Sequence, residues 1–213
     1  MPEIEAIAPQ FASARHRNDT AELGMWVFIA SEVLLFGGLI LGYFVYRHTY
    51  TADFAAASRH TSIAIGTANT AILLTSSFLV ACAVDAASAE TRRLVAMLLS
   101  GAILLGVTFI VLKGIEYSDE YREHLVPGID FSFDAVHANG AQLFFVFYFV
   151  ATSIHALHML VGIVLLAVLA RLNYRSPTAR HHAALHSAAL YWHFVDIVWI
   201  FLFALIYLPG RST

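Results

Sequence analysis

The chain has 213 residues, of which 59% are hydrophobic and only 13% carry a charge. A soluble globular domain is typically about half apolar and about a quarter charged, so this composition indicates a protein that resides in a membrane. The formal net charge of −3 offers no basic surface for nucleic acid, and the single Cys82 excludes both an internal disulfide and a cysteine metal cluster.

Five segments are long and apolar enough to cross a bilayer. A transmembrane helix needs about 20 largely apolar residues, and its backbone polar groups must be paired within the helix because hydrocarbon offers no partner. We therefore predict an all-α, polytopic membrane helix bundle, with a polar N-terminal segment at 1–22 and one five-helix domain at 23–209. The predicted spans are Leu23–Tyr46, Ser62–Val84, Leu94–Ile115, Gln142–Ala170 and Ala189–Leu208.

The first span carries a carboxylate close to its middle. Glu32 lies nine residues into the span, about 14 Å deep at the helical rise of about 1.5 Å per residue. A charge at the bilayer centre costs at least about 2.5–3.5 kcal/mol, so Glu32 is expected to face protein or water. Two main interpretations stay open. Glu32 either joins helices through a hydrogen bond or takes part in proton movement, and contact with a metal or a lipid headgroup is a third.

The connection after the third span is acidic. It runs from Glu116 to Ala141 and holds six acidic residues against the single Arg122. We interpret it as a solvated loop outside the membrane, with the docking of a partner as the alternative. Basic residues number seven on the N-terminal side of the membrane and five on the other side when Lys113 is counted among the loops. This bias predicts a cytoplasmic N-terminus and an external C-terminus.

The last two spans each carry two polar side chains three residues apart. His155 and His158 share one face of the fourth span. His193 and Asp196 have the same spacing in the last span and are close enough to hydrogen-bond each other. Such a carboxylate would fix the tautomer of a metal-bound or proton-relaying imidazole. The alternative for both pairs is hydrogen bonding between helices inside the bundle.

Four further residues are expected to shape helix packing. Gly38 and Gly42 form a G-x-x-x-G pair, which lets another helix approach closely. Trp192 and Trp199 are seven residues apart and so lie on one face of the last span. We expect the two indoles to fill the core of the bundle, with a partner interface as the alternative.

A metal site is a further alternative for the buried histidines. Two neighbouring histidines on one helix, such as His155 and His158, cannot bind opposite faces of the same haem. A di-iron bundle typically repeats Glu-x-x-His on two helices, and this sequence does not. A mixed site from Glu32, His155, His158 and His193 remains conceivable, although we expect no metal on this chain.

Five stretches, taken in order, resemble subunit III of the haem-copper terminal oxidases. They are IASEVLLFGG around Glu32, the looser NTAILLTSS from Asn69, LLGVTFIVLKGIEY with Glu116 and Tyr117 at its end, ATSIHALHMLVGIVLL and YWHFVDIVWIFLFALIY. The resemblance extends from about Leu23 to Pro209, and the closing motif is its most specific part.

The resemblance implies an accessory subunit of a proton-pumping cytochrome c oxidase in aerobic respiration. In that family subunit III has no redox centre and no catalytic residue. Haem and copper lie in the catalytic subunit I, and subunit II receives the electrons. Subunit III is associated with bound phospholipid, with sustained proton uptake and with protection during turnover. The resemblance also implies an integral membrane protein, and we expect it to lie in the bacterial plasma membrane.

The resemblance also suggests which residues carry these roles. Glu32 takes the place of the family's membrane-buried carboxylate. The family's interior polar residues correspond here to His155, His158, His193 and Asp196. Glu116 and Tyr117 end the segment that closes in Glu-Tyr in the family.

One departure from the family keeps alternatives open. The mitochondrial-type subunit has seven helices, two of which precede the Ser-Glu helix with which this chain begins, so the resemblance is to a short five-helix form. Such forms also resemble subunit III of quinol oxidases and a homologue associated with nitric oxide reductase. Outside the family, the alternatives are a redox-active membrane cytochrome and a proton-coupled transporter with Glu32 as its proton site.

Overall fold

The computed structural model describes residues 14–89, 91–134, 136–175 and 179–211, and this part of the chain is helical, without a strand. Five of the helices are long and apolar enough to span a membrane, which confirms the five predicted spans. The helices are α1 (Ala14–Thr49), α2 (Thr51–Ser58), α3 (Ile63–Ser88), α4 (Arg92–Arg122), α5 (Ala138–Arg175) and α6 (Ala179–Tyr207).

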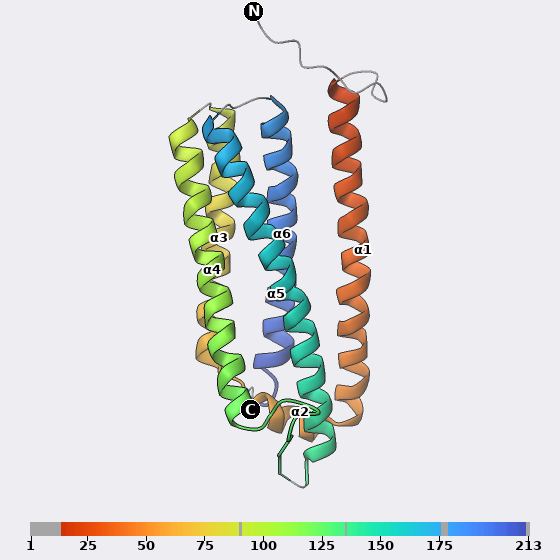
Figure 1. Ribbon diagram of the computed structural model, residues 1–213. Helices are drawn as coiled ribbons and strands as arrows, with labels where there is room; N and C mark the ends of the chain where they lie inside the picture. Colours follow the sequence, from red (N-terminus) through yellow and green to blue (C-terminus); the bar gives the residue numbers. More distant parts are fainter. Residues whose placement is uncertain (1–13, 90, 135, 176–178, 212–213) are drawn as a thin grey trace, which may run out of the picture.

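Helices α3 to α6 form an antiparallel four-helix bundle, and α1 runs along one side of it (Figure 1). In the bundle α3 packs on α4 and α6, and α5 packs on the same two helices. Helix α1 packs chiefly on α5, α6 and the short α2. Only 11% of the α1 span is buried within the chain, against 50% for α6, so α1 presents most of its surface to lipid or to another protein.

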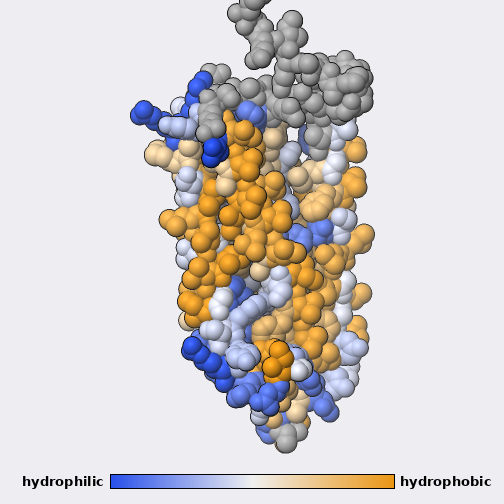
Figure 2. All heavy atoms as spheres, in the orientation of Figure 1, coloured by the Kyte–Doolittle hydropathy of each residue, from blue (hydrophilic) through white to orange (hydrophobic). Residues whose placement is uncertain are grey.

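The outer surface fits a membrane environment. Apolar side chains cover most of the visible face between the two ends of the bundle, and hydrophilic residues gather at the lower end, where α2 lies (Figure 2). We call this the α2 end. It carries the C-termini of α1, α4 and α6 and the connection between α4 and α5.

The short helix α2 was not among the predicted elements. The chain after α6 holds it in place: the Ser58 hydroxyl donates to the Pro209 carbonyl at 2.7 Å, and the Arg211 guanidinium donates to the Ser58 carbonyl at 3.1 Å. Gly210 adopts a φ of +76°, and a Cβ there would lie 2.5 Å from the Ala55 carbonyl oxygen. Only glycine fits this crossing, because an L side chain would be strained at that φ and would collide with α2.

The acidic connection begins later than expected. Helix α4 continues to Arg122, whereas the predicted third span ends at Ile115. Glu116 and Glu120 are therefore not solvated loop residues, since each is at most 4% exposed. Lys113, which we had counted as a loop charge, is also buried. The interpretation as a solvated loop is therefore wrong for Glu116–Arg122, whereas residues 123–134 are not helical. Tyr148 of α5 and Tyr207 of α6 bond to Lys113 or Glu116 and let the helix continue past these charges.

Candidate functional site

Glu32 and His158 meet where α1 packs on α5. The Glu32 Oε2 atom lies 3.1 Å from His158 Nε2, and both side chains are about 85% buried. His158 Nδ1 lies 2.8 Å from the Ile154 carbonyl oxygen, which can only accept, so Nδ1 carries a hydrogen. The contact between Nε2 and Oε2 then requires one proton, held either by the imidazole or by the carboxyl. The two residues, 126 positions apart, form a single proton-sharing pair.

Aromatic side chains enclose this pair. The Phe36 ring packs edge-on against the His158 imidazole, with centroids 5.5 Å apart. The Tyr191 hydroxyl of α6 donates to the His158 carbonyl at 2.9 Å, and its ring stacks beside the imidazole. Three long helices therefore position the pair: α1 supplies the carboxylate, α5 the imidazole and α6 the tyrosine.

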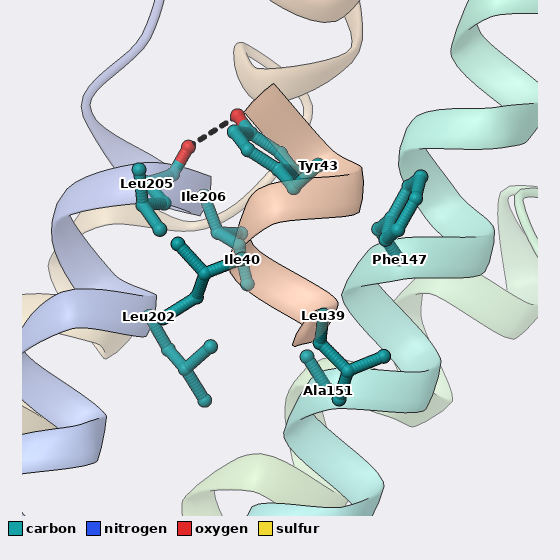
Figure 3. Close-up of a pocket in the computed structure, with 8 residues that line it drawn as sticks. All are labelled: Leu39, Ile40, Tyr43, Phe147, Ala151, Leu202, Leu205 and Ile206. Carbon is teal, nitrogen blue, oxygen red and sulfur yellow. Dashed lines mark hydrogen bonds between the residues drawn. The ribbon is translucent and has the colours of Figure 1, made fainter. Parts of the chain in front are cut away.

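A second polar contact joins α1 to the bundle near the α2 end. The buried Tyr43 hydroxyl donates to the Leu205 carbonyl of α6 at 2.5 Å (Figure 3). Phe147 of α5 lies on the other side of the same turn, and the lining is otherwise aliphatic (Figure 3). These contacts fix the position of α1 on α5 and α6, and with it the position of Glu32.

The spacing of His193 and Asp196 allowed a hydrogen bond between them, but the two side chains do not bond to each other in the structure. His193 Nδ1 lies 2.6 Å from the Ser77 hydroxyl of α3. Asp196 is 3% exposed, and neither of its carboxylate oxygens has a hydrogen-bond partner among the described residues. Both side chains face α3, whose Ser77 lies beside them, and the hydroxyl bonds to the imidazole. An interhelical contact thus replaces the expected local one.

His155 lies at the centre of the α3 to α6 bundle. It is fully buried, and neither ring nitrogen has a hydrogen-bond partner in the described part of the chain. Its ring packs between Phe109, with centroids 5.5 Å apart, and Trp199, at 5.2 Å. Although it is one turn from His158, it faces the bundle core instead of α1.

Glu116 belongs to a buried charge cluster that sequence reasoning missed. Lys113 Nζ donates to Glu116 Oε2 at 2.8 Å, to the Tyr148 hydroxyl at 2.9 Å and to the Tyr207 hydroxyl at 3.1 Å. The Tyr207 hydroxyl donates to the same Glu116 oxygen at 2.8 Å. Tyr117 lies beside the ammonium, 4.8 Å from Nζ to the ring centroid. The spacing of Lys113, Glu116 and Glu120 along one helical face was the available signal.

The predicted packing residues have different surroundings. Trp192 and Trp199 are buried in the core, and their indole nitrogens donate to Ser76 at 2.8 Å and Thr70 at 3.1 Å, both on α3. A Cβ at Gly42 would lie 3.3 Å from the Phe147 ring. A Cβ at Gly38 would meet no atom within 4 Å, so no helix of the described chain packs closely on Gly38 as the motif had suggested.

The candidate metal ligands are not gathered in one place. In the described ranges, no three His, Cys, Asp or Glu side chains lie close enough together to hold a metal ion. The conceivable mixed site needed four residues, of which only Glu32 and His158 are joined. His193 is turned toward Ser77 and His155 toward Phe109 and Trp199.

Comparison with known proteins identifies the family. The family model described as cytochrome c oxidase subunit III matches residues 12–211. Cytochrome c oxidase subunit 3 of Gadus morhua is 33% identical over 195 residues, which are 88% of this chain and 69% of that protein. The subunit 3 proteins of Pelomedusa subrufa and Struthio camelus are 31% and 34% identical over the same shares of both chains. With these matches and five apolar helices, the chain belongs to the cytochrome c oxidase subunit III family, as an integral membrane component of a respiratory oxidoreductase complex.

Proposed function

We propose that the chain is an accessory subunit, without a redox centre of its own, in a proton-pumping cytochrome c oxidase. On this proposal it lies beside a catalytic subunit I that holds haem and copper, in a complex whose subunit II receives electrons. It supports proton uptake by the catalytic subunit, binds lipid and protects the complex during turnover. Cytochrome c is our choice of donor over a quinol because the matched relatives are named as cytochrome c oxidase subunits.

The pair of Glu32 and His158 is the observation that carries this proposal. A carboxylate in the middle of a membrane helix is costly unless a partner compensates it, and His158 is that partner. A carboxylate–imidazole pair that shares one proton is neutral whichever group holds it, so the proton can pass between the two side chains without leaving a bare charge in the membrane. On our proposal the pair binds water or a lipid headgroup and keeps the neighbouring subunit's proton entrance hydrated.

A groove beside the pair suits a lipid chain. It lies between α1 and α6, has a volume of about 400 Å³ and is lined almost entirely by apolar side chains, including Val33, Phe36, Ile197 and Phe201. Phe36 both lines the groove and packs on His158, so a lipid in the groove would touch the wall of the proton-sharing pair. We assign the groove to an acyl chain of a bound phospholipid.

The orientation follows from the basic residues. With Lys113 buried, four basic residues remain at the α2 end, against seven at the opposite end. From the positive-inside rule we propose a cytoplasmic N-terminus and an external C-terminus. The bacterial plasma membrane stays a prediction, and the relatives named above, which are from vertebrates, lend it no support.

Replacement of Glu32 tests the proposal. In the assembled oxidase, Glu32→Gln and Glu32→Ala should slow proton uptake severalfold and reduce the number of turnovers before inactivation. Glu22→Gln is the matched control, because Glu22 is an exposed acid on the same helix and its replacement should change neither quantity. Unchanged uptake and unchanged lifetime in both Glu32 variants would reduce the pair to a structural contact. Stoichiometric iron or copper in the purified chain would contradict the absence of a redox centre.

A further inference from the structure

The ammonium group of Lys113 has no hydrogen left for a second carboxylate. An ammonium group has three hydrogens, and Lys113 directs one each to Glu116, Tyr148 and Tyr207. Glu116 Oε2 receives two donors, from Lys113 and from Tyr207. These bonds identify Glu116 as the ionised partner of the ammonium, and the pair is neutral as a whole.

Glu120 completes the cluster without sharing in these bonds. Its side chain is buried on the same face of α4, and neither carboxyl oxygen has a hydrogen-bond partner in the described part of the chain. The groups that face it are Lys113, Glu116 and Tyr117 from α4, Glu123 directly after α4, Tyr148 from α5 and Tyr207 from α6. The cluster holds one ammonium for two buried carboxyl groups, and that ammonium is bonded to Glu116. A second buried carboxylate would have no cation to compensate it, so the arrangement favours a neutral Glu120 that holds its proton.

A polar cavity lies just outside Glu120, at the α2 end. It has a volume of about 410 Å³, and its lining includes His60, Glu123, Asp134 and His137. The backbone N–H of Leu125, whose side chain also lines the cavity, donates to the Glu120 carbonyl at 3.0 Å. Leu125 is itself 3% exposed. The cavity thus adjoins the turn of chain that follows the buried acid, and Glu123 and Leu125 of that turn are in its lining. Its imidazoles and carboxylates can carry protons.

We infer that Glu120 is a proton-exchange site, which takes up and releases its proton through the cavity at the α2 end of the bundle. On this inference the fixed pair of Lys113 and Glu116 lies on the inner side of the site, and the buried Leu125, which lines the cavity, is the barrier to proton exchange. The site is independent of the role proposed for Glu32, because it lies on other helices and opens toward one end of the bundle.

Infrared spectroscopy of the full chain in lipid nanodiscs tests the inference. Glu120→Gln should remove one protonated-carboxyl stretching band that shifts when the sample is transferred to D₂O. Glu116→Gln should leave that band in place and should lower the thermal unfolding temperature, since it deprives Lys113 of its counter-ion. Glu120→Gln should leave the unfolding temperature unchanged, because an amide has nearly the shape of a neutral carboxylic acid.

Two variants test the route. Leu125→Ala should increase the rate at which the Glu120 band shifts in D₂O at least severalfold, because the shift reports hydrogen–deuterium exchange of that carboxyl group. The control is the infrared band that Asp196→Asn removes, because Asp196 faces α3 and does not line the cavity. Leu125→Ala should not change the rate at which this Asp196 band shifts in D₂O. The inference fails if Glu120→Gln removes no protonated band, if it unfolds the chain, or if the band is insensitive to D₂O. It also fails if Leu125→Ala changes the two bands equally.

Discussion

At the scale of single residues, Lys113 is held by several polar and aromatic contacts. Its ammonium makes three hydrogen bonds and lies within 6 Å of four aromatic rings, those of Tyr117, Tyr148, Trp199 and Tyr207. Cation–π contacts of this kind strengthen when the ammonium is removed from water. Lys113 thus joins α4 to α5 and α6 through charge as well as packing.

Lys113→Met should destabilise the fold by about 3–5 kcal/mol, because it leaves Glu116 as a buried carboxylate without its cation. The double variant Lys113→Met/Glu116→Gln should recover most of that loss, since removing both charges of a buried pair is often nearly neutral. Unfolding titrations of the four proteins of this double-mutant cycle give the coupling free energy. Additive losses in the double variant would show that the pair carries no net interaction.

The same residues show where prediction from sequence ends. Lys113, Glu116 and Glu120 lie at the edge of an apolar run, where charges usually mark the end of a span, so α4 was expected to stop at Ile115. Their burial depends on Tyr148 and Tyr207, which belong to other helices. A hydropathy pattern along one segment does not contain that information.

At the scale of helices, Trp192 sets the distance between α6 and its neighbours. A Cβ at Gly162 of α5 would lie 2.8 Å from the Trp192 ring, and one at Gly106 of α4 would lie 3.0 Å from it. The indole nitrogen meanwhile donates to Ser76 of α3. One side chain therefore contacts three helices, and the small residues on α4 and α5 make room for it, as is typical of membrane helix interfaces.

Gly162→Ala should cost about 1–3 kcal/mol, because the added methyl group forces the indole away from Ser76 in a tightly packed core. Near-ultraviolet circular dichroism and thermal unfolding would report the shift of Trp192 and the loss of stability. Gly38→Ala is the matched control, since a Cβ there meets no atom within 4 Å. Equal effects of the two substitutions would contradict a specific role for Gly162.

The helices themselves were largely predictable, and the contacts between them were not. Each candidate span is 26 to 37 residues long and largely apolar, so hydropathy alone located five spans. The eight residues of α2 were missed because so short a helix depends on Arg211 and Gly210 from the other end of the chain. His193 and Asp196 had the right spacing to bond to each other, but Ser77 of α3 offered His193 a partner that local spacing cannot reveal.

At the scale of the whole molecule, the two ends of the bundle differ in charge and in structure. The α2 end carries the polar cavity, the acidic residues that follow α4, and α2 held by the C-terminal segment. The opposite end carries the short connection after α3, next to Arg92 and Arg93. We expect this asymmetry to set the direction in which the chain inserts, because arginine side chains near the ends of spans tend to remain on the cytoplasmic side.

Cysteine labelling would measure that direction. In a background with Cys82→Ser, Ile129→Cys places a thiol at an exposed position of the α2 end, and Ala89→Cys places one at an exposed position of the opposite end. A membrane-impermeant maleimide should label Ile129→Cys in intact cells and should label Ala89→Cys only after the membrane is opened. The reverse pattern would place the α2 end in the cytoplasm. Glu120 would then exchange its proton with the cytoplasm, which would change the side that the site serves but not its route through the cavity.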